Sequence, residues 1–408
     1  MLSISFRIYF VSNKKQMEVT EISKDTATVK PKKSAVREWL NSVLFAVMAA
    51  TLIRWLFFSA FVIPTSSMEN TLLVGDYLFV SRLNYGTTMP ITPLQIPLTH
   101  QTIWGTSIPS YLDWLKLPQF RLPGFSNVKK GDVVVFNLPV EHQNLYQKYS
   151  TVLPNLKPHP VDLRTNYIKR CVAQPGDLLE IRDGQIFING NKVVNPSRMQ
   201  GEYFVSTGAP INELNIFKKN GIVDYSQFTE TFNDSISNND EFGYIVKTTP
   251  ALALKLKGFD FIKRVEPILM PKGVKETHLF PESDLINWNK DQYGPLIVPR
   301  EGMTVVLNAL NVAKYGEIIN SYEGNDGLKI ADGKITRNGK ALVEYTFKQD
   351  YFFMMGDNRH NSADSRYWGF VPKDHIVGKA VFVWMSLDPN PTSLINKIRW
   401  NRIFRVIN

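Results

Sequence analysis

Apolar residues are concentrated in one long run near the N-terminus, from Trp39 to Ile63. A helix of roughly 20 apolar residues is long enough to cross a bilayer. The run therefore predicts a membrane-spanning anchor over residues 37–57. Arg54 then lies at the far end of the helix, where a long basic side chain can reach the lipid headgroups.

The basic residues on the two sides of this run are distributed unequally. Lys30, Lys32, Lys33 and Arg37 precede the run, whereas no Lys or Arg follows Arg54 until position 82. Basic residues favour the cytosolic side of a membrane. We therefore predict a cytosolic basic tail over residues 1–36 and an extracytoplasmic remainder, anchored once in the cell (inner) membrane. A cleaved secretory signal is disfavoured, because it needs a shorter apolar core and small residues at the cut.

Beyond the anchor the chain is rich in short runs of β-branched and aromatic residues bounded by Gly, Asp or Pro, which indicates a mainly β fold. The strands expected are 77–80, 132–136, 179–181 and 380–384. Six prolines between 84 and 128 predict an extended surface loop. The domains expected are a catalytic core in two parts, 58–183 and 336–408 (the latter with the C-terminal tail), and an insertion lobe, 184–335.

Asp-Gly and Asn-Gly pairs flank both ends of this insertion, at 183–184 and 189–190 and again at 332–333 and 338–339. Such pairs favour tight hairpin turns, because a positive φ costs little there. They predict a β-hairpin at each end of the insertion.

Composition narrows the function classes. The net charge of +10 is spread along the chain and not gathered in one arm. This pattern gives no sign of nucleic-acid binding and suits contact with anionic membrane lipids. Cys171 is the only cysteine, so an intrachain disulfide and a cysteine-based zinc site are both excluded.

Two residues offer acyl-transfer chemistry. Ser67 follows the membrane exit with no histidine beside it, and Lys169 lies among strand formers. In a strand Lys169 shares a face with Tyr167 and Cys171, so we expect it to be buried. Burial lowers a lysine pKa, and moving it from about 10.4 to near 8 costs roughly 3 kcal/mol. The neutral amine can then take the proton of a serine, as in Ser/Lys enzymes.

A third polar cluster lies between Met354 and Gly369. Asp364 and Arg366 are close enough to pair bidentately, and Ser362 can donate a hydrogen bond to the Lys169 amine. A metal site built from Asp357, His360 and Asp364 is the competing interpretation. It is disfavoured because the interleaved arginines repel a cation, so we expect no metal and no cofactor.

A set of four motifs appears in order along the chain. They are Ser67-Met68, residues 131–136, residues 167–177, and residues 356–366 with Gly356-Asp357-Asn358 at their start. This set resembles that of bacterial type I signal peptidase (leader peptidase) and covers about half of the chain. The resemblance implies an antiparallel β catalytic core with an inserted lobe behind an N-terminal transmembrane helix.

The resemblance also implies a role for each residue. Ser67 becomes the nucleophile, Lys169 the general base, and the Thr65 hydroxyl together with the Ser67 N–H the oxyanion hole. Ser362 positions the lysine, while Gly356, Asp357, Asp364 and Arg366 shape the site. The small S1 and S3 substrate pockets fall at Phe61, Ile63, Met68, Leu72, Val135, Tyr167 and Ile168.

The implied activity is a serine endopeptidase that removes signal peptides from exported preproteins through an acyl-enzyme. Its partners are signal peptides with small residues before the cleavage site, and membrane lipids. The chain departs from the family at Asn70, where a proline is common and its loss is expected to loosen the turn. It departs again at position 360, where the family often has Asp and this chain has His360. We expect no catalytic role for His360.

Three alternatives compete with this interpretation. A self-cleaving Ser/Lys repressor needs a DNA-binding helix-turn-helix, for which residues 1–36 are too short. A Ser-His-Asp hydrolase is disfavoured because no Gly-x-Ser-x-Gly is present. A non-catalytic, membrane-tethered binding protein that uses the insertion lobe stays open. No pattern specifies an oligomeric state.

Overall fold

The computed structural model describes residues 34–139, 159–228, 242–391 and 395–407. Residues 1–33, most of the predicted cytosolic tail, lie outside the described part. The chain divides into two units between residues 47 and 48. The boundary between them falls inside helix α1 (Ala35–Leu56).

Helix α1 is long and apolar enough to cross a membrane. It has 22 residues, none of them buried, and a mean hydropathy of 1.5 in its most apolar window. At 1.5 Å per residue such a helix extends about 33 Å, against a bilayer hydrocarbon core of about 30 Å. The helix begins two residues before the predicted anchor and ends one residue before its predicted end.

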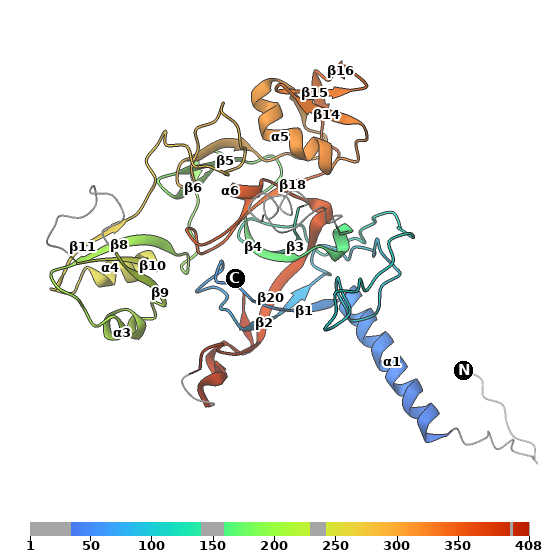
Figure 1. Cartoon of the computed structure of the whole chain (residues 1–408), viewed down its shortest axis with the longest axis horizontal. Coiled ribbons are helices and arrows are strands. Elements are labelled where there is room, and N and C mark those ends of the chain that lie inside the picture. Colours follow the sequence, from blue (N-terminus) through green and yellow to red (C-terminus); the bar gives the residue numbers. More distant parts are fainter. Residues whose placement is uncertain (1–33, 140–158, 229–241, 392–394, 408) are drawn as a thin grey trace, which may run out of the picture. The chain divides into compact units, whose positions relative to one another are not determined.

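The central sheet of the second unit is antiparallel and contains three of the four predicted strands, 77–80, 132–136 and 380–384, whereas the strand predicted at 179–181 lies in another sheet (Figure 1). Its strand order is β1-β2-β20-β3-β4-β18-β19, and β21 pairs with β20. The strands are β1 (Phe58–Val62), β2 (Asp76–Ser81), β3 (Val133–Asn137), β4 (Asn166–Ala173), β18 (Tyr351–Met355), β19 (Val371–Pro372), β20 (Ile376–Ser386) and β21 (Arg405–Val406). The mainly β fold with an antiparallel core is thereby confirmed.

The sheet is covered on both faces, which explains the unbroken apolar run of β3. Val133 and Val135 point into one cluster, and Val134 and Phe136 into another. The Ser67-side cluster comprises Ile63, Met68, Leu72, Leu78, Val80, Val133, Val135, Val377, Ala380, Val383 and Ile407, with Phe61 and Ile168 packed against it. The Trp368-side cluster comprises Tyr85, Val128, Val134, Phe136, Leu138, Cys171, Phe352, Met354, Trp368, Val371 and Ile376, with Tyr167 packed against it.

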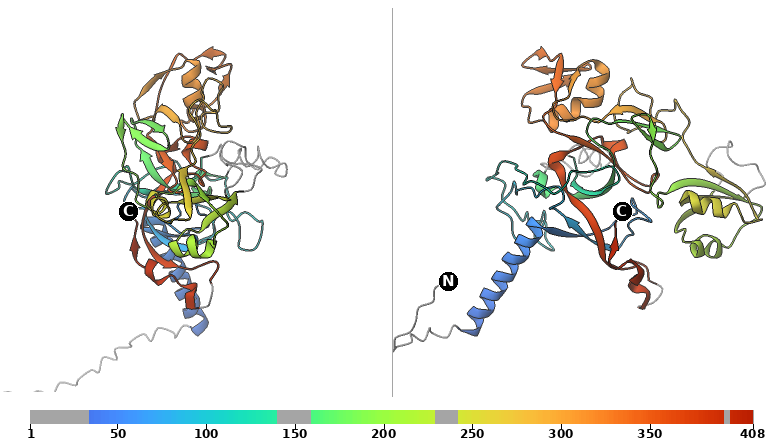
Figure 2. Two further views of the ribbon diagram at one scale, coloured as in Figure 1. Left: turned by 90° about the vertical axis from the view of Figure 1, so that its left-hand side faces the viewer. Right: turned by 180° about the vertical axis from the view of Figure 1, so that it is seen from behind.

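Two four-stranded sheets follow β4 in the chain. One has the order β12-β5-β6-β7 and the other β11-β8-β10-β9. Their strands are β5 (Leu178–Arg182), β6 (Gln185–Ile188), β7 (Asn191–Lys192), β8 (Gly201–Thr207), β9 (Asp224–Phe228), β10 (Phe242–Thr248), β11 (Ile262–Pro267) and β12 (Tyr293–Ile297). Helices α3 (Glu213–Ile216) and α4 (Pro250–Leu256) lie beside the second sheet (Figure 2). Ala253 and Leu256 of α4 are buried in the apolar cluster that covers this sheet.

A smaller helical and β region leads back to β18. It contains α5 (Ala309–Ser321) and the strands β13 (Thr304–Val306), β14 (Leu328–Ala331), β15 (Lys334–Arg337), β16 (Lys340–Ala341) and β17 (Glu344–Thr346). Helix α6 (Ser365–Trp368) follows β18. The short 3-10 helices are η1 (Val161–Leu163), η2 (Lys218–Asn220), η3 (Lys373–His375), η4 (Ile395–Lys397) and η5 (Trp400–Arg402).

The predicted hairpin turns are confirmed. Asp183 and Gly184 have φ values of 50° and 71°, and Asp332 and Gly333 have values of 50° and 68°. The first pair joins β5 to β6 and the second joins β14 to β15. The predicted domain boundaries at 183/184 and 335/336 therefore fall inside hairpins, because a strand and its partner fold as one unit. The division into core and lobe stays a prediction.

A buried ion pair links the C-terminal tail to the turn between β1 and β2. The Arg402 guanidinium donates to both Asp76 carboxylate oxygens, with Nε 2.9 Å from Oδ1, and Nη2 also donates to the Thr71 carbonyl at 3.1 Å. Asp76 is fully buried and also accepts from the Leu73 N–H. Arg402 therefore neutralises the one carboxylate that closes this turn.

Replacing Arg402 by Gln leaves a buried carboxylate without its cation. Losing one member of a buried pair costs about 3–5 kcal/mol. We expect Arg402→Gln to lower the free energy of unfolding by that amount in chemical denaturation. Arg405→Gln, at a half-buried arginine of β21, is the matched control. Equal stability of the two variants would contradict a structural role for the pair.

Candidate active site

Ser67 lies in the turn that connects β1 to β2. The Ile63 N–H donates to the Asp76 carbonyl and the Gly75 N–H donates to the Ile63 carbonyl, both at 2.9 Å, and these bonds close the loop at its base. Within the loop, Met68 and Leu72 are buried in the Ser67-side cluster. These two apolar side chains fix the turn to the core and leave Ser67 half-buried at its surface.

Lys169 reaches Ser67 from β4. Its Nζ lies 2.7 Å from the Ser67 Oγ and also donates to the Ile168 carbonyl at 3.1 Å. The amine also lies 5.5 Å from the centre of the Tyr167 ring. Two residues separated by 102 positions in sequence thus meet within hydrogen-bonding distance.

The environment of Lys169 favours the neutral amine. Only 4% of the residue is exposed. Burial lowers its pKa to about 8, although the carboxylates of Asp364 and Asp357 act in the opposite direction. The low lysine pKa expected from the sequence is confirmed. A neutral amine at this distance can accept the serine proton and make the hydroxyl a nucleophile.

Asp357 connects β4 to the Ser67 turn. Its carboxylate accepts from Arg170 Nε at 2.8 Å, from Arg170 Nη2 at 2.7 Å and from the Thr71 hydroxyl at 2.6 Å. Both Arg170 and Asp357 are buried. Sequence reasoning assigned no role to Arg170 or Thr71. The sequence does contain a signal for this contact. Arg170 is a second charged residue beside Lys169 in an apolar strand, and a buried guanidinium requires an anionic partner.

Asp364 and Arg366 form the predicted bidentate pair. Arg366 Nε lies 2.9 Å from Asp364 Oδ1 and Nη2 lies 2.8 Å from Oδ2, with both residues fully buried. Asp364 also accepts from the Gly356 N–H at 3.1 Å and caps α6. Burial alone raises the pKa of this carboxyl, but the adjacent guanidinium holds it below its usual value. The pair stays charged and fixes the loop that follows β18.

Gly356 packs so closely on this loop that no side chain fits. A Cβ built there lies 2.2 Å from Ser362 Oγ and 2.5 Å from the Ser67 carbonyl oxygen. The Ser67 carbonyl also accepts from the Asn358 N–H at 3.1 Å. The loop after β18 therefore rests directly on the backbone of Ser67.

Ser362 lies in the site, but its contact differs from the expected one. Within the described part of the chain, no hydrogen bond joins its buried Oγ to Lys169. The hydroxyl instead lies beside Asp364, where it helps to keep the pKa of that carboxyl low. The Ile168 carbonyl is the group that the Lys169 amine contacts besides Ser67.

Six of the seven residues predicted for the substrate pockets gather in the Ser67-side cluster. They are Phe61, Ile63, Met68, Leu72, Val135 and Ile168. Tyr167 does not join them, because neighbouring strand residues point to opposite faces. Its ring lies in the Trp368-side cluster, edge-on to Trp368 with 5.3 Å between ring centres. Thr65 is exposed in the turn two residues before Ser67.

The two departures from the family pattern have structural reasons. Asn70 has a φ of 67°, which a proline cannot adopt, and its carbonyl accepts from Arg198 Nη1 at 3.1 Å. Backbone bonds also hold the turn, including Leu72 N–H to the Met68 carbonyl at 2.7 Å. The turn has a left-handed residue at this position, and the expected loosening stays a prediction. His360 is buried and its Nε2 lies 3.0 Å from Asp291 Oδ1.

The three residues that were considered as metal ligands contact other side chains instead. Asp357 and Asp364 are each bound to an arginine, and His360 contacts Asp291. Among the described residues, no three His, Cys, Asp or Glu side chains come together as a metal-binding group. Two guanidinium groups on the two carboxylates do not fit a cation.

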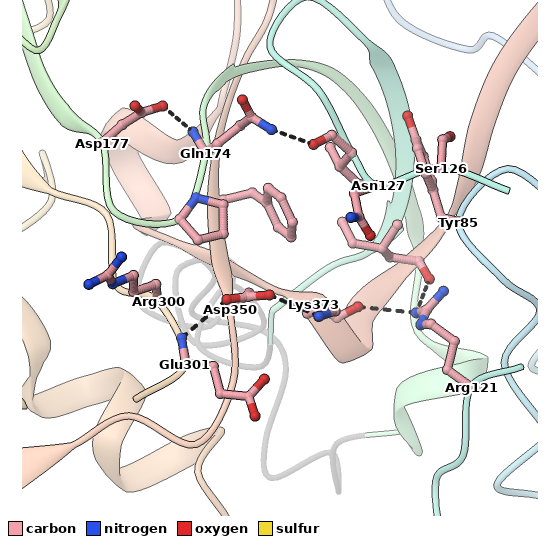
Figure 3. A pocket seen from close by; sticks show the side chains of 14 residues that line it. Tyr85, Arg121, Ser126, Asn127, Gln174, Asp177, Arg300, Glu301, Asp350 and Lys373 are labelled. Carbon is pink, nitrogen blue, oxygen red and sulfur yellow. Dashed lines mark hydrogen bonds and ion pairs between the residues drawn. The ribbon is translucent and has the colours of Figure 1, made fainter. Parts of the chain in front are cut away.

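A separate pocket of about 400 Å³ lies elsewhere on the core (Figure 3). None of the predicted site residues lines it. Two of its basic groups have partners: Lys373 pairs with Asp350 at 2.8 Å, and the Arg121 guanidinium donates to the carbonyls of Gly86, Lys373 and Ile376. With these groups engaged, the pocket offers no reactive pair comparable to Ser67 and Lys169.

Comparison with known proteins shows the family that has this arrangement of motifs. The family described as "Signal peptidase, peptidase S26" matches residues 36–242 and 298–385, which is more than half of the chain. The chain belongs to this signal peptidase family. It is therefore a hydrolase of the serine peptidase class, and the resemblance to bacterial type I signal peptidase is confirmed.

Individual signal peptidases align over nearly the whole chain. Signal peptidase I of Buchnera aphidicola subsp. Acyrthosiphon pisum (strain APS) is 25% identical over 98% of this chain and 90% of its own length. Signal peptidase I of Haemophilus influenzae is 23% identical over 92% of this chain and 76% of its own. Signal peptidase I of Rickettsia massiliae is 24% identical over 91% and 93%. The family match includes residues 184–242, for which the sequence offered no motif.

The pH dependence of peptidase activity tests the role of Lys169. Below about pH 8 the amine is protonated and cannot act as a base, so kcat/KM should fall about tenfold per pH unit. Above pH 8 the rate should level off. Lys169→Arg should be inactive throughout, because a guanidinium stays charged. An inflection near 6.5, the ordinary histidine pKa, would contradict a lysine base.

A second prediction concerns the contact between Gly356 and Ser67. Gly356→Ala places a methyl group against the Ser67 carbonyl and Ser362, and a displacement of about 1 Å in such a site can cost 100-fold in rate. We expect kcat to fall by about that factor. The control is Gly201→Ala, whose new Cβ meets its nearest atom at 3.5 Å. Full activity of Gly356→Ala in steady-state kinetics would show that the loop tolerates displacement.

Proposed function

We propose that this protein is a membrane-anchored serine endopeptidase that removes N-terminal signal peptides from exported preproteins. The observation that carries the proposal is the 2.7 Å contact between the Ser67 hydroxyl and the buried Lys169 amine. Membership of the signal peptidase family supports the substrate class. The relatives named signal peptidase I support it as well.

The mechanism uses the lysine twice. Lys169 takes the Ser67 proton while Oγ attacks the scissile carbonyl, and the ammonium then gives a proton to the leaving amine of the mature protein. Water next attacks the acyl-enzyme, and the same amine takes its proton. The Lys169 ammonium then returns this proton to Ser67 Oγ as the acyl bond breaks, and the signal peptide leaves as a carboxylic acid.

The developing oxyanion needs hydrogen-bond donors. We assign this role to the Ser67 N–H and the Thr65 hydroxyl, which lies exposed in the same turn and is free to rotate toward a substrate. One such donor is typically worth about 2.7–4 kcal/mol in the transition state. Ser362 and the two arginine–carboxylate pairs act by positioning the loop beside Ser67.

The sheet provides edges for an extended substrate. In the described part of the chain β1 is the last strand on its side of the sheet, and β18 pairs with β4 only at Arg170, Cys171 and Ala173. The edge of β4 nearest Lys169 is thus open to an added strand, which would bind through its backbone.

The pocket residues explain a preference for small side chains. Met68 and Leu72 are almost completely buried in the Ser67-side cluster. They can form only the floor of a pocket, and a shallow pocket admits Ala-like side chains. We place the S1 and S3 pockets here, with Phe61, Ile63, Val135 and Ile168 around them. Tyr167 lies on the other face of β4, so we leave it out of the pocket walls.

Helix α1 serves as the anchor in this proposal. Its length and apolar composition suit a single span, and the one-sided basic residues at its N-terminal flank put residues 1–36 in the cytosol. Ser67 then follows the membrane exit of the chain closely, on the extracytoplasmic side of the cell (inner) membrane. A signal peptide in the same bilayer presents its cleavage region at that surface.

The competing function is that of a non-catalytic binding protein tethered to the membrane. It gives no reason for the burial of the Lys169 amine. Burying an amine so that its pKa falls from 10.5 to about 8 costs about 3 kcal/mol of stability. A binding lobe gains nothing from that cost, whereas a general base requires it.

Purified full-length protein and a preprotein with an Ala-x-Ala cleavage site test the proposal. We expect cleavage by the unaltered protein and a loss of at least about 1,000-fold in Ser67→Ala and in Lys169→Ala, because either change removes the reacting pair. Ser283→Ala, at a half-buried serine, and Lys275→Ala, at an exposed lysine, are the matched controls; both residues lie in the segment between β11 and β12. Processing that persists in both dyad variants would refute the mechanism. No processing by the unaltered protein would refute the function.

A further inference from the structure

One asparagine of the loop that follows β18 contacts the backbone of both Ser66 and Ser67. Asn358 Nδ2 donates to the Ser66 carbonyl at 3.2 Å, and the Asn358 N–H donates to the Ser67 carbonyl at 3.1 Å. Asn358 is 1% exposed and lies 292 positions from Ser66 in the sequence. These two bonds attach the backbone around Ser67 to a distant part of the chain.

The bond to the Ser66 carbonyl bears on the Ser67 N–H, which we assigned to the oxyanion hole. The two groups belong to one peptide bond. A trans peptide group is planar, so its carbonyl and its N–H point in opposite directions. Within the described part of the chain, the Ser67 N–H has no acceptor of its own. Its direction is therefore set through the carbonyl on the other side of the peptide plane.

A second bond on the same carbonyl is local. The Glu69 N–H donates to the Ser66 carbonyl at 2.9 Å and closes the turn that contains Ser67. This bond joins two residues of one turn, so it moves with the turn and does not place it relative to Lys169. Asn358 supplies that link from outside the turn. A carbonyl that accepts two hydrogen bonds is also more strongly polarised, which makes the N–H of its peptide a better donor.

Asn358 is itself held firmly. Its backbone forms an isolated parallel β-bridge with Gln200, whose N–H donates to the Asp357 carbonyl at 2.9 Å. The carboxylate of Asp357 accepts from two nitrogens of Arg170, which is the neighbour of Lys169 in β4. The asparagine and the proposed base are therefore positioned from the same strand.

A role in packing alone does not explain an amide at this position. Among the described residues, the buried Asn358 Oδ1 has no hydrogen-bond partner. Burying an unpaired polar atom costs stability, and an apolar side chain of the same shape would avoid that cost. The bond that the side chain does make is the one from Nδ2 to the Ser66 carbonyl. This bond is what the amide contributes.

We propose that Asn358 is a positioning residue of the oxyanion hole, whose side chain sets the direction of the Ser67 N–H. The proposal rests on the proposed function and deepens it. A donor stabilises the oxyanion most when it already points to the place where the charge develops, because no reorientation is then needed during the reaction. Lys169 prepares the nucleophile, and Asn358 prepares the N–H that receives the charge.

Asn358→Leu in the full chain tests this role, because leucine has the branching of asparagine and lacks the amide donor. Losing a whole oxyanion donor costs about 100–1,000-fold in kcat, so a donor that loses only its orientation should cost about 10-fold, with KM nearly unchanged. Asn358→Ala should behave in the same way. The matched control is Asn361→Ala. Asn361 is exposed in the same loop, and its Nδ2 donates to the Ser66 hydroxyl at 3.1 Å and not to the carbonyl, so kcat should stay that of the unaltered protein.

A pair of inhibitors separates this role from a general loss of packing. In a peptide aldehyde that ends in Ala, Ser67 Oγ bonds to the aldehyde carbon, and the hydroxyl proton passes through Lys169 to the aldehyde oxygen. That oxygen then lies where the oxyanion forms. The matching peptide alcohol cannot add to the serine. In Asn358→Leu the affinity for the aldehyde should fall by the same factor as kcat, and the affinity for the alcohol should stay.

The pH profile is the third measurement. The inflection near pH 8 should stay in Asn358→Leu, because the Lys169 amine contacts Ser67 and the Ile168 carbonyl. An unchanged kcat and aldehyde affinity would overturn the proposal. A shifted inflection, or an equal loss of affinity for aldehyde and alcohol, would overturn it as well. If the unaltered protein neither cleaves the preprotein nor binds the aldehyde, the proposed function fails and this inference fails with it. An active protein that is indifferent to the loss of the asparagine removes this inference alone.

Discussion

The contact between a desolvated lysine amine and a serine hydroxyl is the constraint on which the rest of this structure depends. The Lys169 pKa of about 8 requires nearly complete burial of Nζ, yet its partner Ser67 has to stay open to a substrate. The cost of about 3 kcal/mol is complete below pH 8 and disappears above the ordinary lysine pKa. The central sheet offsets it by burying apolar residues on both faces.

Two buried arginine–carboxylate pairs make that geometry rigid. Asp357 joins Arg170 on β4 to Thr71 in the turn that holds Ser67, while Asp364 and Arg366 fix the loop that rests on the Ser67 carbonyl. Each pair is bidentate, so each fixes an orientation as well as a distance. The segment between β11 and β12 also contributes: Asp291 contacts His360 at 3.0 Å, and the Arg366 carbonyl accepts from the Phe280 N–H at 2.8 Å. Residues of the predicted insertion lobe thus contact the loop that follows β18.

Local patterns predicted the elements well, and contacts across the sheet poorly. The strands around 132–136 and 380–384 and the Asp-Gly hairpins follow from residue type within a few positions, so they were predictable. The low pKa of Lys169 was predictable too, because alternation in a strand puts it between Tyr167 and Cys171. Ser362 was expected to contact Lys169 and lies beside Asp364 instead. The Pro-rich segment 84–128 was predicted as a loop and contains no helix or strand, but the exposure of its apolar side chains depends on which way each one turns.

By itself the sequence predicted the long apolar helix, the β character of the core, the turns and the Ser67–Lys169 pair that we propose as the reacting residues. These properties depend on composition, periodicity and short motifs. Only the tertiary structure decided that Arg170 and Thr71 hold Asp357 and that Asn70 takes a left-handed turn. The physical reason is that a side chain's partner depends on the register and direction of strands far apart in the chain. Ser67 and Lys169, separated by 102 positions, meet only because the sheet brings β4 beside the turn after β1.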